Sequence, residues 1–137
     1  MNSIKVIGVL CVLMAGTFAA RASCAANFTQ EGVPLVTGIT YKSWVLYPGL
    51  DSKLAFKNLH RAVVAEGFED VQPNAGLGTI SAVQETSGSG REQLLRISVR
   101  KSGNGTRVTG TFLIQAGQLA SADSVRSGLC GILDSAR

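Results

Sequence analysis

The chain has 137 residues, enough for a single domain, and carries 13 Lys and Arg against 9 Asp and Glu. Hydrophobic residues make up 45% and charged residues 16%, which excludes an intrinsically disordered chain. Its 3 Cys and 1 His are too few for a disulfide-dense scaffold or a zinc site with several protein ligands. No sequence motif indicates a type of reaction, and we expect no cofactor.

Residues 1–22 have the three parts of a secretory signal peptide. Lys5 supplies the positive start, a run of 15 apolar and small residues follows over 6–20, and Ala20-Arg21-Ala22 offers small side chains to the signal peptidase. The run is shorter than the about 20 residues that a membrane-spanning helix needs. We therefore expect an exported protein, secreted or periplasmic, without a transmembrane segment in the mature chain.

The net charge changes when this segment is removed. Lys5 and Arg21 leave with it, so 11 basic residues face 9 acidic ones and the net charge falls from +4 to +2. Such a small positive charge does not indicate binding to nucleic acid.

Cys24 and Cys130 remain at opposite ends of the mature chain, whereas Cys11 lies inside the signal. An oxidising compartment favours a disulfide between them. Two alternatives stay open. Cys24 closely follows an apolar run, as the lipid-attachment cysteine of a bacterial lipoprotein does, although Arg21 fits that signal poorly. Cleavage after Ala26 would remove Cys24 altogether.

In residues 23–38 the apolar residues recur at no regular spacing, which predicts an irregular N-terminal arm. One domain follows over 39–137. Residues 40–47 are rich in aromatic and β-branched residues, as a strand should be. Asp51 or Ser52 is suited to cap a helix that runs to about Glu66, because apolar residues recur there at helical spacing.

The second half of the chain predicts several strands and a closing helix. We expect strands over 68–71, 77–85, 93–101 and 106–115, the last two with clear alternation of apolar and polar residues. A helix over about 121–134 ends the chain, with Ser121 as its cap.

Gly103-Asn104-Gly105 predicts a hairpin between the last two strands, because Asn-Gly favours a type I′ turn. We place Asn104 and Gly105 at its centre, since moving the turn back by one residue would set Arg100 opposite Arg107. Both registers leave the same residues on the same faces.

These elements predict an α+β fold: an antiparallel β-sheet of 4–5 strands with two helices on one face, in the order β-α-β-β-β-β-α. Over about residues 40–134 this order resembles the TATA-binding-protein-like arrangement, which also occurs in small exported bacterial proteins. The resemblance rests on element order alone and carries no function with it.

Candidates for catalysis are weak. His60 lies in the first predicted helix, where a lone His is usually a surface residue, and no Ser stands in a nucleophile elbow. Glu66, Glu69 and Asp70 gather around Gly67, a placement typical of a solvated helix end. We therefore predict a protein that is not an enzyme, with an exported hydrolase as the weaker alternative.

The polar face of the predicted sheet is the remaining candidate. Arg96, Arg100 and Arg107 share its parity, with Leu94 and Leu113 among them. This is either a solvated face or a surface that binds an acidic protein or an anionic envelope polymer. The sequence thus favours a small exported binding protein of unknown partner, with an envelope lipoprotein acting in assembly as the alternative.

Overall fold

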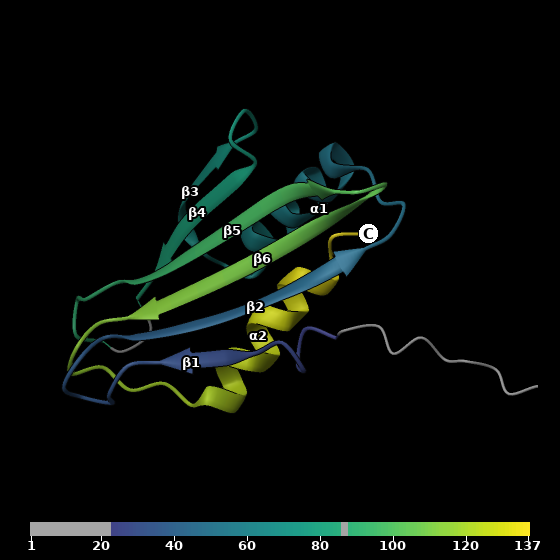
Figure 1. Ribbon diagram of the computed structural model, residues 1–137. Helices are drawn as coiled ribbons and strands as arrows, with labels where there is room; N and C mark the ends of the chain where they lie inside the picture. The colour runs from purple at the N-terminus through teal and green to yellow at the C-terminus, as the bar shows by residue number, and fades with distance from the viewer. Residues whose placement is uncertain (1–22, 86–87) are drawn as a thin grey trace, which may run out of the picture.

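The computed structural model describes residues 23–85 and 88–137 as a twisted antiparallel sheet with two helices (Figure 1). The elements are β1 (Thr29–Glu31), β2 (Ile39–Tyr47), α1 (Ser52–Ala65), β3 (Glu69–Asn74), β4 (Thr79–Gln84), β5 (Gln93–Ser102), β6 (Gly105–Ile114) and α2 (Ala122–Asp134). The sheet has six strands in the order β1-β2-β6-β5-β4-β3. The α+β class is confirmed, but the predicted count of 4–5 strands is wrong.

The additional strand is β1, which lies within the segment expected to be an irregular arm. It pairs with β2 over only three positions, from Thr29 opposite Lys42 to Glu31 opposite Thr40. All three β1 residues are exposed, so the strand leaves no alternation of apolar and polar residues to detect in the sequence. Phe28 holds this segment against the sheet, because its ring stacks on Tyr41 at 5.9 Å between centroids.

Both helices begin where the sequence predicts. The Asp51 side chain accepts a hydrogen bond from the Leu54 backbone N–H at 2.9 Å, and the Ser121 hydroxyl accepts one from the Ser124 N–H at 3.3 Å. These caps satisfy backbone donors that a helix start otherwise leaves without partners. The chain leaves α1 through Gly67, whose φ of +82° suits the residue that follows a helix.

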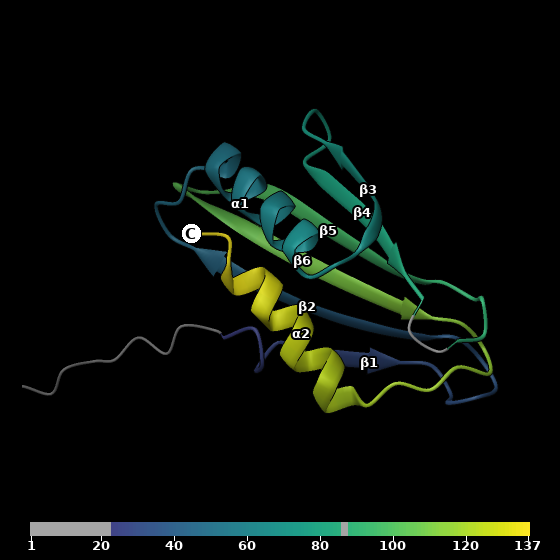
Figure 2. The same cartoon turned by 180° about the vertical axis from the view of Figure 1, so that it is seen from behind.

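The two helices cover the same face of the sheet (Figure 2). α2 packs on β2 and β6, while α1 packs mainly on β5, β3 and β4. Alternate residues of β2, β5 and β6 point into this layer and are buried with the inner faces of both helices. The opposite side of the sheet has no covering layer among the described residues.

The β5–β6 hairpin differs from the prediction by two residues in register. Ser102 pairs with Gly105, so Gly103 and Asn104 form the turn, and Arg100 lies directly opposite Arg107. Gly103 has a φ of +58° and Asn104 has a negative φ. A positive φ at the first central position alone is the pattern of a type II′ turn, which favours Gly there. The predicted type I′ turn at Asn104-Gly105 is therefore wrong.

Cys24 and Cys130 form a disulfide that joins the N-terminal segment to α2, with their Cα atoms 5.5 Å apart. Cys24 is buried, and the Ser43 hydroxyl on β2 donates a hydrogen bond to its carbonyl oxygen at 2.5 Å. This pairing confirms the disulfide among the alternatives for Cys24. A lipid on the Cys24 thiol would exclude this bond, and cleavage after Ala26 would remove the residue that forms it.

Two tyrosines of β2 tie the sheet to α2. The Tyr47 hydroxyl donates to the Leu133 carbonyl at 2.9 Å, and the Tyr41 hydroxyl donates to the Ala120 carbonyl at 3.3 Å. Burial raises the pKa of both phenols, and the Asp134 carboxylate raises that of Tyr47 further, against the opposing effect of Arg137. Both tyrosines therefore favour the neutral form that donates these bonds.

Within residues 23–85 and 88–137, neither helix has the length and apolar character that a membrane crossing requires. The predicted signal peptide of residues 1–22 and Cys11 lie outside the described residues.

Candidate functional site

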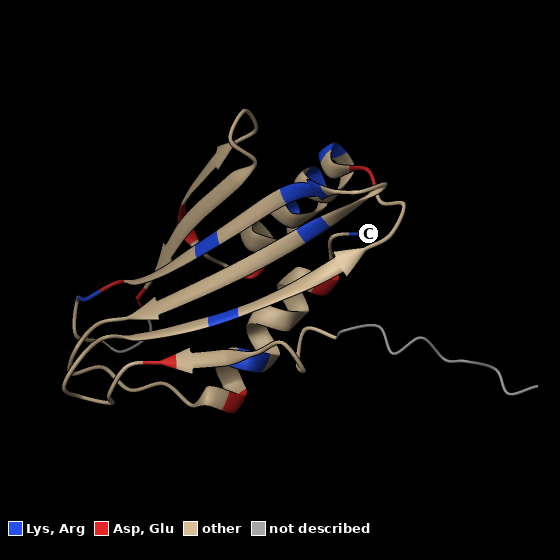
Figure 3. Cartoon of the chain, viewed as in Figure 1, with Lys and Arg blue, Asp and Glu red and all other residues tan. Residues whose placement is uncertain are grey.

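The uncovered side of the sheet brings together the three arginines named from the sequence. Arg96 and Arg100 on β5 and Arg107 on β6 are all exposed and project from the side opposite the helices. Figure 3 shows Lys and Arg positions, in blue, along the neighbouring strands β2, β6 and β5. Their shared face follows from strand parity and therefore survives the register error in the hairpin.

The pairing of β2 with β6 adds residues that the sequence did not assign to this face. Lys42 lies opposite Thr111, which lies opposite Arg96, so the row Lys42–Thr111–Arg96 crosses three strands. Trp44 lies opposite Thr109 in the next row. The sequence analysis did not assign Lys42 and Trp44 to this face because it did not identify the second neighbour of β6. No local sequence pattern indicates that β2 pairs with β6.

We call this surface the open face and define it by seven residues at its centre: Lys42, Trp44, Arg96, Arg100, Arg107, Thr109 and Thr111. The half-buried Leu94 and Leu113 form a pair at one end of it. No Asp or Glu occurs in β2, β5 or β6. The centre of the open face is therefore cationic, with threonine hydroxyl groups and the Trp44 ring between the charges and aliphatic surface at one end.

Two of the arginines are held in place by neighbouring groups. The Arg107 guanidinium lies over the Trp44 ring, 4.1 Å from its centroid, in a cation–π contact. The Arg100 guanidinium donates to the Leu77 carbonyl in the β3–β4 turn and to the Val99 carbonyl. Within the described part of the chain, the side chains of Arg96 and Lys42 make no hydrogen bond or ion pair.

The residues considered for catalysis do not converge. His60 is half-buried on α1 and lies outside the lining of three cavities of the described structure. Glu66 follows the end of α1, whereas Glu69 and Asp70 belong to the edge strand β3. Glu66 lines one of these cavities and His60 lines none of them, so the described structure does not place the two in a shared cavity.

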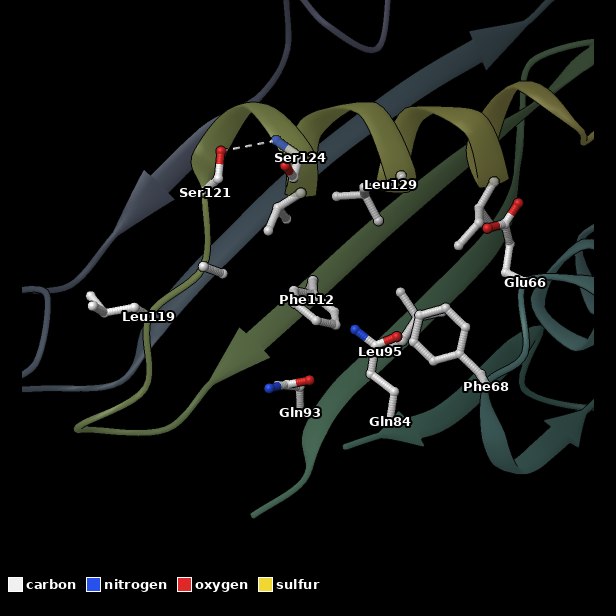
Figure 4. A pocket seen from close by; sticks show the side chains of 14 residues that line it. Glu66, Phe68, Gln84, Gln93, Leu95, Phe112, Leu119, Ser121, Ser124 and Leu129 are labelled. Carbon is white, nitrogen blue, oxygen red and sulfur yellow. Dashed lines mark hydrogen bonds between the residues drawn. The ribbon is translucent and has the colours of Figure 1, made fainter. Parts of the chain in front are cut away.

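A groove between α2 and the segment that follows α1 is a second candidate, which the sequence did not suggest. It lies on the side of the sheet away from the open face and has a volume of about 340 Å³. Figure 4 shows Phe68, Leu95, Phe112 and Leu129 around it, with Gln84, Gln93 and Glu66 among its polar groups. The lining residues come from six separate elements and connections, so only the tertiary structure brings them together.

No protein-family model matches the chain, and a search of curated proteins finds no relative.

Proposed function

We propose that this chain is a small exported protein that has no chemistry of its own and binds a macromolecular partner through the open face. The partner class is an acidic protein or an anionic polymer of the cell envelope. The signal-like segment of residues 1–22 and the Cys24–Cys130 disulfide support export, because disulfides persist in oxidising compartments.

The observation that carries the proposal is the composition of the uncovered strands. Four cations, Lys42, Arg96, Arg100 and Arg107, stand on three neighbouring strands that contain no carboxylate. Arginine and tryptophan are enriched in protein interfaces, where a planar guanidinium gives directed hydrogen bonds. Arg100 and Arg107 are already restrained by Leu77 and Trp44, which lowers the entropy lost on binding.

The alternatives receive less support. An envelope lipoprotein would need the Cys24 thiol that the disulfide occupies. An exported hydrolase would need polar groups gathered near His60. The elements from β2 to α2 follow an order that resembles the TATA-binding-protein-like arrangement. This resemblance is part of the proposal for the fold and implies no activity.

A capture experiment with matched charge removal tests the function. The immobilised protein is compared with the double variant Arg96→Ala/Arg100→Ala and with Lys57→Ala/Arg61→Ala, each exposed to an extract of the native compartment at low salt. Lys57 and Arg61 are exposed on α1, which packs on the other side of the sheet from the open face. Both double variants lose two positive charges, so only the position of the charge differs.

We expect the open-face variant to lose its partner while the α1 variant retains it, and the loss to be greatest at low salt because added salt screens charges. Equal thermal stability of the three proteins is the folding control. If the two variants capture the same partners as the unaltered protein at low salt, the open face is a solvated surface and the proposal fails.

A further inference from the structure

The groove between α2 and the segment that follows α1 has apolar walls. Its aromatic and aliphatic lining residues include Phe68, Leu95, Phe112 and Leu129, together with Leu119, Val125 and Ile132. Gly128 lines it from the middle of α2, and a Cβ added there would meet no atom within 4 Å. Glycine is a poor helix former, and here no close backbone approach requires it. The absence of a side chain at Gly128 leaves this space unoccupied.

The charge at one end of the groove is negative. Glu66 is the only ionisable residue among the lining residues, and it stands at the carboxyl end of α1. The last turn of α1 has no basic residue, and Glu66 makes no ion pair within the described part of the chain. A helix carboxyl end carries partial negative charge, so the carboxylate and the helix end add to one another.

Further polar groups lie beside the apolar surface. The Gln84 and Gln93 side chains from β4 and β5 and the Ser124 hydroxyl of α2 surround it (Figure 4). A volume of about 340 Å³ is near the lower end of the about 300 to 1,000 Å³ that is typical of small-molecule sites. The groove therefore suits a single short apolar chain or ring rather than a folded partner.

From these observations we propose that the groove binds a small amphipathic molecule with a cationic head and an apolar tail. The head lies beside Glu66, and the tail lies along Phe68, Phe112 and Leu129. This site is on the opposite side of the sheet from the open face. Its test is therefore independent of the test of the proposed function.

Two probes of equal chain length and opposite charge test the charge preference. Octylammonium and octanoate are titrated by calorimetry into the unaltered protein at neutral pH and low salt. An exposed ion pair contributes little, so we expect octylammonium to bind about threefold to fivefold more tightly. Glu66→Gln should bring the two affinities together. Equal affinities for the unaltered protein would overturn the cationic assignment.

Chain length tests the apolar part of the site. Hexyl-, octyl- and decylammonium should bind with increasing affinity, by up to about fourfold for each added methylene group until the groove is full. Affinity that does not depend on chain length would contradict a site for an apolar tail.

A matched pair of glycine variants tests the location. Gly128→Leu places a side chain in the groove, whereas Gly131→Leu adds the same side chain on α2 at a position that does not line it and that also has open space around it. We expect Gly128→Leu to weaken octylammonium binding at least tenfold and Gly131→Leu to change it less than twofold. Unchanged binding by Gly128→Leu would overturn the proposal.

A measurement on the unaltered protein decides the location even if a leucine variant fails to fold. Amide chemical shifts followed during the octylammonium titration should move for Gln93, Ser124 and Gly128. They should stay constant for Ser98 and Thr109 on the other side of the sheet. Shift changes that centre on the open face instead would assign the probe to a different site and refute the one proposed here.

Discussion

Arg100 and Arg107 face each other as a cross-strand pair, yet their guanidinium groups turn in opposite directions. Arg107 lies over Trp44 on β2, while Arg100 reaches the Leu77 carbonyl in the β3–β4 turn. Like charges directly opposite are unfavourable when the side chains stay close. Here each guanidinium has a partner outside the β5–β6 hairpin, which separates the two positive charges. The repulsion expected from the two strands alone is therefore reduced.

The stacking of Arg107 on Trp44 has a spectroscopic signature, because Trp44 is the only tryptophan of the chain. Arg107→Ala should expose the indole ring, shift its emission to longer wavelength and increase its quenching by acrylamide. The free energy of unfolding should fall by about 0.5 to 1 kcal/mol, the usual contribution of an exposed cation–π contact.

Arg96→Ala is the control for that experiment, because it removes an arginine of the open face that does not contact Trp44 in the described structure. It should leave the emission maximum and the quenching unchanged. An identical response of the two variants would show that Trp44 senses the net charge of the face rather than the Arg107 side chain.

The disulfide makes a prediction about stability. Closing a loop of roughly 100 residues contributes up to about 4.7 kcal/mol by restricting the unfolded chain, and often less. Cys130→Ser should therefore lower the melting temperature by several degrees, as should reduction of the unaltered protein. The double variant Cys24→Ser/Cys130→Ser should match the single variant.

Thiol labelling of protein taken from its native compartment checks the same bond directly. Alkylation without reductant should label neither Cys24 nor Cys130, and the intact mass should carry no lipid. Complete labelling of both thiols would contradict the disulfide, whatever the melting temperatures show.

The hairpin turn separates two reasons why a glycine resists substitution. Gly103 has a φ of +58° and open space around it, so Gly103→Ala should cost about 1 to 2 kcal/mol from backbone strain. At Gly105 the φ is not positive, but a Cβ would collide with the Tyr47 carbonyl oxygen and Pro48. Gly105→Val should therefore also destabilise, through that collision.

Urea denaturation of the two glycine variants and of Asn104→Ala measures these costs. Asn104 has a negative φ, so its replacement should have little effect. A larger loss for Asn104→Ala than for Gly103→Ala would place the turn at Asn104-Gly105 instead.

The features of this fold that could be predicted from the sequence are those set by residues close to one another in the chain. Both helices could be predicted because their caps, Asp51 and Ser121, and their apolar spacing lie within a few residues of one another. The face shared by Arg96, Arg100 and Arg107 also needed only strand parity. The disulfide was one of three open alternatives, because sequence alone did not bring Cys24 close to Cys130.

The remaining features depend on contacts between distant segments. The exposed strand β1 forms only because β2 offers it an edge. The hairpin register depends on the partners of Arg100 in the β3–β4 turn and of Arg107 on β2, and on the space that Tyr47 leaves beside Gly105. The groove needs Glu66, which follows α1, and Gly128 of α2 to lie near one another.

Alkaline pH tests the contact between Tyr47 and α2. The pKa of Tyr47 is raised above its ordinary value of 10.0, first by burial and then by the Asp134 carboxylate. Folding therefore favours the protonated phenol. Its contribution is fully present below the unfolded pKa and is lost as the pH rises through the folded one, when the hydrogen bond to Leu133 can no longer be donated.

Denaturation by urea at pH 8 and pH 11 should show this loss. Tyr47→Phe should start less stable at pH 8, by about 0.5 to 1.5 kcal/mol, and then lose less between the two pH values than the unaltered protein. Tyr41 is present in both proteins, so its own titration cancels. Parallel losses of stability would contradict the role given to Tyr47.

Arginine footprinting in the native compartment tests the use of the open face most directly. Phenylglyoxal modifies accessible guanidinium groups, and Arg96 on the open face and Arg61 on α1 are both exposed in the described structure. Both should react in the purified protein. In the native extract at low salt we predict that Arg96 is protected while Arg61 reacts as before. Arg96 that reacts equally in the extract and in the purified protein would contradict a partner on this face.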